Sequence, residues 1–299
     1  MAQKLINITR IIGDKTLRIL ESVCKVNGVI GVVIYGSISR GDYVNGLSDI
    51  NIAIVASQEV DTRNLWSLLS GDPRISPLLL QLDKLKDICT KGDLLCHNIF
   101  KESLILCGDD RLKNLSIYYG PRVTSYTVAQ AKNLALSTLS LAIEGYMQGD
   151  KNKALRNAYH SLRYTITYYS TRTIQKVPLK DSDMVNTCIR IAPSNLCKFF
   201  NEIRGMRNTL QQLRLAELET LLHILATSLK VTIPPISSIM LALRNLDNAK
   251  LIALRIKNIE EHKPYGNRAH YVLISSIPSK NRIVEVEVSW NGIVSVEEK

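Results

Sequence analysis

This sequence lacks several features that would assign it to a special class of protein. Its 299 residues contain no apolar run near the length of roughly 20 residues that crosses a bilayer, so we expect no membrane partner. The start of the chain mixes charges into an apolar stripe at helical spacing. That pattern predicts an amphipathic helix at about 4–26 instead of a signal peptide. These absences predict a cytoplasmic protein.

Patterns of metal-binding and disulfide-rich proteins are also missing. The six cysteines form no CxxC pair and the five histidines form no HExxH motif, so we expect no structural zinc site. Because the cysteines are scattered and few for this length, we predict reduced, mostly buried thiols. They are Cys24, Cys89, Cys96, Cys107, Cys188 and Cys197.

Positive charge is present in excess, and it is unevenly distributed. Residues 1–115 carry 14 Lys and Arg against 13 Asp and Glu, and residues 233–299 carry 9 against 7. Residues 116–232 carry 15 against 7, a net charge of +8 within the total of +11. The middle of the chain therefore faces something anionic or simply repels itself in water.

Three regions of different texture predict three domains. Residues 1–115 alternate helical patterns with Val- and Ile-rich strand patterns, which predicts an α/β domain. Residues 116–232 repeat apolar residues every three or four positions and predict an all-α bundle of four or five helices. Residues 233–299 predict a small α+β module of unknown role, in which Asn291-Gly292 marks a tight hairpin.

The stretch VVIYGSISRGDYVNGLSDINIAIVA, residues 32–56, carries the candidate chemistry. A predicted strand ends in Gly36-Ser37, where glycine lets the backbone approach a triphosphate. The serine hydroxyl and the loop N–H groups can then hold the terminal phosphates. Arg40 and Gly41 continue the loop and complete the predicted nucleotide-binding set.

Asp49 and Asn51 follow on the next predicted strand, where alternate residues share one face. Two carboxylates at such positions would bind Mg²⁺ or Mn²⁺ and act on the attacking and leaving oxygens of in-line nucleotidyl transfer. An amide at the second position keeps an oxygen ligand but removes one charge. We predict Asp83 as the third metal ligand, on a strand face shared with Gln81; alternatively, Asp83 starts the following helix.

This pattern resembles the signature of the DNA polymerase β-type nucleotidyltransferase superfamily, including its minimal and kanamycin nucleotidyltransferase branches. The signature is Gly-Ser, a spacer, and then Asp-hydrophobic-Asp on a strand; here residues 38–48 form the spacer. The resemblance implies the nucleotidyltransferase fold, with a mixed sheet and helices, an NTP substrate and Mg²⁺ or Mn²⁺. It also implies transfer of a nucleoside monophosphate to a hydroxyl on a small molecule, protein or RNA. Asn51 departs from the signature and leaves slow catalysis, binding without turnover, or no nucleotide binding open.

The helical region resembles the bundle of kanamycin nucleotidyltransferases and the HEPN partners of minimal nucleotidyltransferases. HEPN ribonucleases carry an arginine with a histidine a few residues later, but Arg207 is followed by Gln212 in that place. Arg156 and His160 have only three residues between them, so no ribonuclease site is carried over. In the drug-modifying relatives a bundle carboxylate is the general base. Glu144 is a candidate for that role, and the alternative is a solvated helix residue.

Basic residues and tyrosines alternate along the same helices. Arg156, Arg163 and Arg172 are the predicted nucleic-acid contacts, since such a surface grips phosphates while tyrosines stack on bases. In the alternative reading the tyrosines pack the bundle and the cations are solubilising. A competing function is therefore a catalytically degenerate nucleotidyltransferase scaffold that binds RNA or a ribonucleoprotein. A toxin–antitoxin-like module is a third, weakened by the missing histidine.

Overall fold

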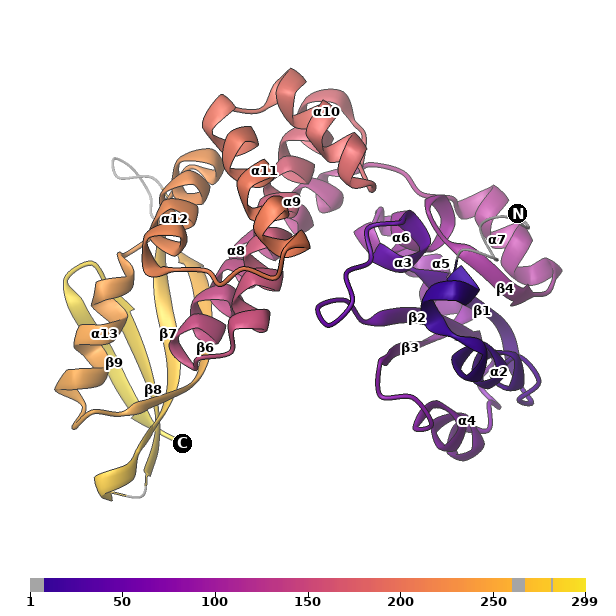
Figure 1. Ribbon diagram of the computed structural model, residues 1–299, viewed down its shortest axis with the longest axis horizontal. Coiled ribbons are helices and arrows are strands. Elements are labelled where there is room, and N and C mark those ends of the chain that lie inside the picture. Colours follow the sequence, from indigo (N-terminus) through magenta and orange to yellow (C-terminus); the bar gives the residue numbers. More distant parts are fainter. Residues whose placement is uncertain (1–7, 260–266, 281) are drawn as a thin grey trace. The chain divides into compact units, whose positions relative to one another are not determined.

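The computed structural model describes residues 8–259, 267–280 and 282–299, which form two compact units (Figure 1). The first unit holds the described residues up to Gln130 together with Ile174–Met184, and the second holds the rest of the described chain. Residues 4–7 of the predicted N-terminal helix lie outside the described residues. The predicted domain boundaries at 115 and 232 stay a prediction.

A mixed sheet forms the centre of the first unit. In the described residues it has four strands in the order β3-β2-β1-β4; β1 is antiparallel to β2 and β4, and β2 is parallel to β3. The strands are β1 (Val29–Tyr35), β2 (Ile50–Ala56), β3 (Ile75–Gln81) and β4 (Leu104–Gly108). Each follows a strand pattern of the sequence, so the predicted mixed sheet is confirmed.

Helices cover both faces of this sheet. On one face α2 and α4 close a core around Val32, Ile34 and Ile52, and on the other α5, α6 and α7 close a core around Val33, Ala53 and Val55. The helices are α2 (Asp14–Val23), α4 (Thr62–Leu69), α5 (Leu82–Lys91), α6 (Leu94–Lys101) and α7 (Asp110–Tyr119). Because both faces are buried, β1 and β2 are apolar runs without alternation, interrupted only by Asn51 near the start of β2.

Five long helices, counted within the described residues, follow and confirm the predicted bundle. They are α8 (Ser125–Met147), α9 (Lys151–Ile174), α10 (Asp181–Ile191), α11 (Ser194–Asn208) and α12 (Leu215–Leu229). The α8–α9 pair packs closely at Gly145, where an added Cβ would lie 2.7 Å from the backbone nitrogen of Ala154. None of the helices that the structure describes combines the length and apolar character that a membrane span requires.

The last part of the chain is an α+β module, as predicted. A helix, α13, lies over a sheet in which β6, β7, β8 and β9 are antiparallel neighbours and β5 joins β7 (Figure 1). The elements are β5 (Val231–Thr232), α13 (Ile236–Asn245), β6 (Lys250–Ile259), β7 (Asn267–Ile277), β8 (Arg282–Ser289) and β9 (Gly292–Glu298). The predicted hairpin at Asn291-Gly292 joins β8 to β9, with φ +106° at Gly292.

The six cysteines are not thiols, so the prediction of reduced cysteines is wrong. They form the disulfides Cys24–Cys107, Cys89–Cys96 and Cys188–Cys197. The first pair is 83 residues apart in sequence but has a Cα–Cα distance of 6.2 Å, because α2 packs beside β1 and β1 pairs with β4. Sequence spacing could not show this proximity, since the sheet topology creates it.

Candidate functional site

The loop after β1 is shaped by two glycines with left-handed backbone angles. Gly36, with φ +82°, begins the short helix α3 (Ser37–Arg40), and Gly41, with φ +84°, ends it. Asp42 and Gly41 both donate their backbone N–H to the Ser37 carbonyl. Residues other than glycine are strained at such backbone angles, so this tight loop requires glycine at both positions.

The loop lies directly against β2. Tyr35, the last residue of β1, is paired with Asn51, and an added Cβ on Gly36 would lie 2.9 Å from Nδ2 of Asn51. Asn51 shares the sheet face of Ala53 and is half-buried. The Gly-Ser turn therefore lies against the strand position at which the signature has its second aspartate.

Asp49 stands at the entrance to β2 and is exposed. The next residue, Ile50, is buried, and its N–H donates to the Arg74 carbonyl at 2.9 Å, which fixes the start of the strand. Two residues along a strand span about 7 Å, so Asp49 lies within that distance of Asn51 along the chain. Asp49 itself has interaction partners in the protein.

Arg40, predicted to bind nucleotide, is instead used to brace the loop. Its Nε donates to Oδ2 of Asp42 at 3.1 Å and its Nη1 to Oδ1 of Asn98 at 3.4 Å. The Arg40 side chain is only 8% exposed. With its donors directed at Asp42 and at α6, the guanidinium holds the loop on α6, and we correct its role from phosphate ligand to loop support.

Asp83, predicted as a third metal ligand, lies at the wrong end of β2. Parallel pairing places Asn51 beside Ser76 and Ala56 beside Gln81, and Asp83 follows as an exposed residue in the first turn of α5. Five strand residues span about 16 Å, so Asp83 cannot share a metal ion with Asn51. The alternative, in which Asp83 belongs to the following helix, is correct, although Gln81 and not Asp83 is the N-cap.

The donor groups at this site fit one magnesium ion but not two. In the described residues no three His, Cys, Asp or Glu side chains gather to hold a metal, and Ser76 occupies the strand position beside Asn51. The Asp49 carboxylate and the Asn51 amide oxygen are hard donors. Mg²⁺ is commonly held by one or two carboxylates plus substrate phosphates and water. The fit is therefore to a single ion that a bound triphosphate helps to coordinate.

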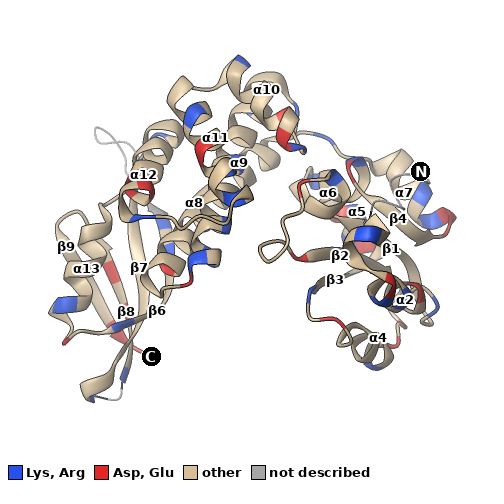
Figure 2. Cartoon of the chain, in the orientation of Figure 1, with Lys and Arg blue, Asp and Glu red and all other residues tan. Residues whose placement is uncertain are grey.

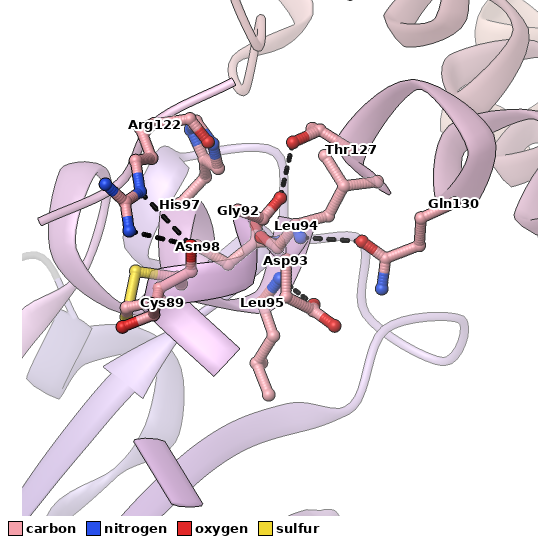
Figure 3. Close-up of a disulfide and its surroundings, with 12 residues drawn as sticks. Cys89, Gly92, Asp93, Leu94, Leu95, His97, Asn98, Arg122, Thr127 and Gln130 are labelled. Carbon is pink, nitrogen blue, oxygen red and sulfur yellow. Dashed lines mark hydrogen bonds between the residues drawn. A yellow bond between two sulfur atoms is a disulfide. The ribbon is translucent and has the colours of Figure 1, made fainter. Parts of the chain in front are cut away.

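The corner between α5 and α6, drawn in Figure 3, carries a residue that contacts this loop. The disulfide Cys89–Cys96 joins α5 to α6, which carries Asn98, the partner of Arg40. Next to Asn98, His97 is fully buried and its Nε2 lies 3.1 Å from the Arg122 carbonyl oxygen. Burial lowers the pKa of His97 to about 4, so this ring is neutral at physiological pH.

A turn that the sequence analysis missed sets the position of α6. Gly92, with φ +80°, ends α5, and the Asp93 side chain accepts the Leu95 N–H at 2.8 Å as the N-cap of α6. Leu94 N–H donates to Gln130 Oε1 at 2.8 Å (Figure 3). A Gly-Asp step is a helix-end and helix-start signal, so Gly92-Asp93 could have marked the boundary between α5 and α6 in the sequence.

The predicted nucleic-acid residues are not one surface. Lys and Arg are spread over the bundle helices (Figure 2), but Arg163 is only 6% exposed and its Nη1 donates to the Tyr159 hydroxyl at 2.7 Å. Arg207 is also buried, with its guanidinium 4.4 Å from the centre of the Tyr159 ring. Arg163 therefore packs the bundle, and its predicted contact with nucleic acid is wrong. Arg156 is half-buried, and Arg172 is exposed.

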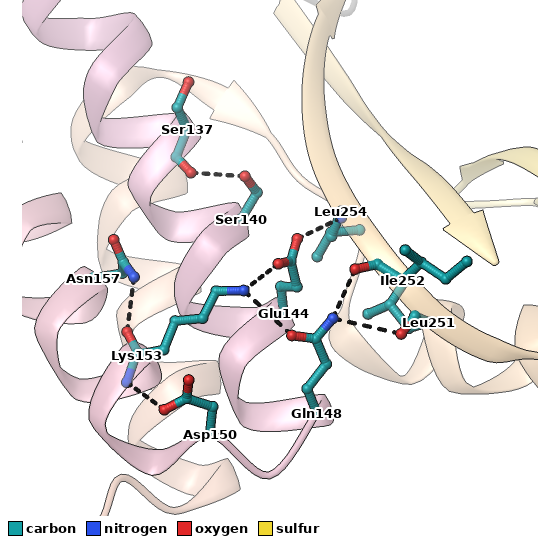
Figure 4. A network of polar contacts seen from close by, with 10 residues as sticks. All are labelled: Ser137, Ser140, Glu144, Gln148, Asp150, Lys153, Asn157, Leu251, Ile252 and Leu254. Carbon is teal, nitrogen blue, oxygen red and sulfur yellow. Dashed lines mark hydrogen bonds and ion pairs between the residues drawn. The ribbon is translucent and has the colours of Figure 1, made fainter. Parts of the chain in front are cut away.

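Glu144, a candidate general base, is neither a base nor a solvated residue. It is 6% exposed and forms an ion pair with Lys153, and its other carboxylate oxygen accepts the Leu254 N–H at 2.7 Å (Figure 4). Gln148, one turn later, donates to the Ile252 carbonyl at 2.7 Å. These side chains attach α8 to β6, so Glu144 has a structural role.

Comparison with known proteins gives one match to a protein family. The sequence model described as the nucleotidyltransferase domain matches residues 17–99, which include the Gly36 turn, Asp49 and Asn51. No curated protein matches the chain. The match ends before the bundle, so the HEPN-like resemblance stays a prediction.

Solved structures give weaker likenesses. A spectinomycin adenyltransferase from Enterococcus faecialis, crystallised with ATP and spectinomycin, is 13% identical with a TM-score of 0.48 over 73% of this chain and 97% of its own. A nucleotidyltransferase-like protein from Exiguobacterium sibiricum is 13% identical with a TM-score of 0.30 over 87% and 99%. Both TM-scores are below 0.5, so neither likeness assigns a substrate. The sequence match itself is confined to the N-terminal part of this chain, where residues 17–99 are similar to the nucleotidyltransferase domain.

Proposed function

We propose that the first unit binds a nucleoside triphosphate and transfers its nucleoside monophosphate to a hydroxyl acceptor. The observation that supports this most is the contact between the Gly36 turn and Asn51, two residues after Asp49. The match to the nucleotidyltransferase domain covers all three positions. A phosphate-binding loop and a metal-binding carboxylate are then neighbours on adjacent strands, as nucleotidyl transfer requires.

Each residue has a defined role in this proposal. Gly36 and Gly41 shape the loop, and the Ser37 hydroxyl, with the loop N–H groups, binds the terminal phosphates. Asp49 and Asn51 would hold one Mg²⁺, which when bound offsets the negative charge of the phosphates. Because the chain supplies one carboxylate where two are usual, we expect nucleotide binding to be better preserved than turnover.

Thermal unfolding with ATP and Mg²⁺ tests the binding step. A ligand at 100 times its Kd stabilises the native state by about 2.7 kcal/mol, and Asp49→Ala should remove most of that gain. Asp87→Ala changes an exposed carboxylate of α5 and should keep it. A stabilisation by ATP that survives Asp49→Ala would place the nucleotide elsewhere and contradict the proposal.

Transfer is tested with α-labelled NTPs and total cell extract. Restoring the second carboxylate by Asn51→Asp should raise the labelled product, and each tenfold gain corresponds to about 1.36 kcal/mol of transition-state stabilisation. If Asn51→Asp binds ATP·Mg²⁺ more tightly but labels nothing, the domain is a nucleotide-binding scaffold and the transfer step is overturned.

The net charge of +8 over residues 116–232 supports a second candidate function, RNA binding by the bundle. The residues that would contact RNA are exposed cations such as Lys151 and Arg172, and not the buried Arg163. RNA binding of this kind has a steep salt dependence and does not change with Asp49→Ala. The same Asp49→Ala variant therefore separates the two functions.

A further inference from the structure

The two outer edges of the C-terminal sheet differ in whether their backbone groups have hydrogen-bond partners. The edge of β6 is covered, because Glu144 accepts the outward Leu254 N–H and Gln148 donates to the outward Ile252 carbonyl (Figure 4). These backbone groups in the middle of β6 therefore have partners from α8 and from the residue that follows it. At the other end of the sheet, β9 is the last strand, and in the part of the chain that the structure describes nothing pairs with its outer side.

The open edge carries apolar side chains that are exposed. On β9, Val294 is 55% exposed and Val296 is 48% exposed. An edge strand usually avoids this combination, because free N–H and C=O groups beside apolar side chains invite another strand to pair. The edge of β9 therefore has the composition of a strand that is paired in a complex.

A pocket lies beside this edge, between α13 and the β8–β9 turn. It has a volume of about 190 Å³ and includes Leu241 from α13 and Trp290 from the turn, which are 56% and 51% exposed. Pockets for whole small molecules are usually about 300–1,000 Å³, so this one suits a single large apolar side chain. A helix next to an open strand edge is the arrangement in which an added strand places alternate side chains in a groove.

Charge at the edge favours a basic partner. The cross-strand register places Glu285 opposite Glu297, and like charges opposite each other destabilise a strand pair. Glu285 is paired with Lys299 at 3.1 Å, whereas Glu297, in the described part of the chain, is exposed and has no ion pair. A lysine or arginine on an incoming strand would supply the missing counter-charge.

We propose that the outer edge of β9 binds an extended segment of a protein partner as an added strand. The segment alternates apolar residues, carries a basic residue next to Glu297, and places one large apolar side chain in the pocket beside Leu241 and Trp290. Backbone hydrogen bonds along the edge then supply affinity, and the pocket and Glu297 supply selectivity.

A synthetic peptide, Ac-Lys-Val-Thr-Phe-Thr-Val-Lys-NH2, provides a direct probe with the full-length protein and isothermal titration calorimetry. In an extended strand the N–H groups of the valines and phenylalanine point to one edge and those of the threonines to the other. We therefore compare a peptide that is N-methylated at the valines and phenylalanine with one that is N-methylated at the threonines. Only one of these two peptides should bind, because only one set of N–H groups faces β9. Equal binding by both, or no binding by the unmethylated peptide, would overturn the proposal.

Variants of the protein test the pocket and the charge separately. Leu241→Asp should weaken the peptide about tenfold, while Met240→Asp, an exposed neighbour outside the pocket, should not. Glu297→Lys should weaken the basic peptide about fivefold and strengthen a version with glutamates in place of its lysines. Glu219→Lys makes the same change of net charge on α12 and should leave both peptides unaffected.

Sedimentation equilibrium tests whether a second copy of this chain, in place of a different protein, pairs with the edge of β9. If β9 paired with a second copy of this chain, the protein would dimerise and the peptide would dissociate the dimer, which would overturn the assignment to a different partner. A monomer that binds the peptide supports the assignment.

Discussion

The two units of this protein differ in where charged side chains find their partners. In the first unit, several close ion pairs form between neighbours in sequence, such as Asp72 with Arg74 at 2.7 Å and Arg40 with Asp42 at 3.1 Å, beside one distant pair of Lys180 with Glu102 at 3.5 Å. In the second unit Glu144 accepts a hydrogen bond from Leu254, 110 residues away in sequence. Partners that are close in sequence leave a readable pattern, whereas partners from distant helices and strands do not.

The disulfides should give the largest difference between the units. Closing a loop of about 83 residues stabilises the folded state by about 4.5 kcal/mol in the chain-entropy account, and a loop of about 9 by about 2.6. Replacing Cys24 and Cys107 by alanine should therefore lower the unfolding free energy of the first unit more than the same change at Cys188 and Cys197 lowers that of the second.

The two tryptophans allow this to be measured for each unit. Trp66 is on α4 in the first unit and Trp290 is in the β8–β9 turn of the second, so urea unfolding of single-tryptophan variants follows each unit separately. A thiol assay on the denatured, unreduced protein is the control. Six free thiols, or a larger loss in the second unit than in the first, would break the comparison.

Sequence patterns predicted the first unit well because its requirements are local. A Gly-Ser turn needs particular residue types at particular positions, so the turn at Gly36 and the following strand with Asp49 could be predicted from the sequence. The close contact of Gly36 with Asn51 came only from the structure. Helical periodicity likewise predicted the bundle. Periodicity does not say which arginine faces inward, however, and Arg163, read as a surface cation, is buried beside Tyr159. The Cys24–Cys107 disulfide and the place of Asp83 depend on how the strands pair in the sheet, which no single segment encodes.

Acid should destabilise the first unit through His97. Burial depresses the pKa of this ring from 6.5 to about 4. Between pH 6.5 and pH 4 the imidazole is therefore protonated in the unfolded chain and neutral in the folded chain. The stability that comes from keeping His97 neutral is fully present above pH 6.5 and is lost as the pH falls toward 4. The loss in unfolding free energy is at most about 3 kcal/mol. His97→Gln should flatten the unfolding free energy of the first unit across that window. His223 is an exposed histidine of the second unit. His223→Gln should leave the pH dependence of the unfolding free energy of the first unit, followed by Trp66 fluorescence, unchanged.

Glu144 tests whether distant partners matter in the second unit. Removing one partner of a buried ion pair costs about 3–5 kcal/mol, and because Lys153 keeps 25% exposure we expect about 2 kcal/mol for Glu144→Ala. The matched change in the first unit is Asp110→Ala, which breaks an exposed pair with Lys113 and should cost no more than about 0.5 kcal/mol. Equal losses in urea unfolding would remove the distinction between the units.

Arg172 should give the smallest effect and decides between the two readings of the basic bundle. Its guanidinium is exposed and its Nη1 donates to the Tyr168 hydroxyl at 2.9 Å, so Arg172→Gln should change stability by no more than about 0.5 kcal/mol. If the bundle binds RNA, the same variant should lower the slope of log affinity against log salt by about one, as expected for one lost phosphate contact. Glu202→Gln, an exposed change on α11 that also alters one charge, is the control. An unchanged slope for Arg172→Gln would mean that this cation only solubilises the bundle, and the charge of the second unit would then be structural at Arg163 and solvated at Arg172.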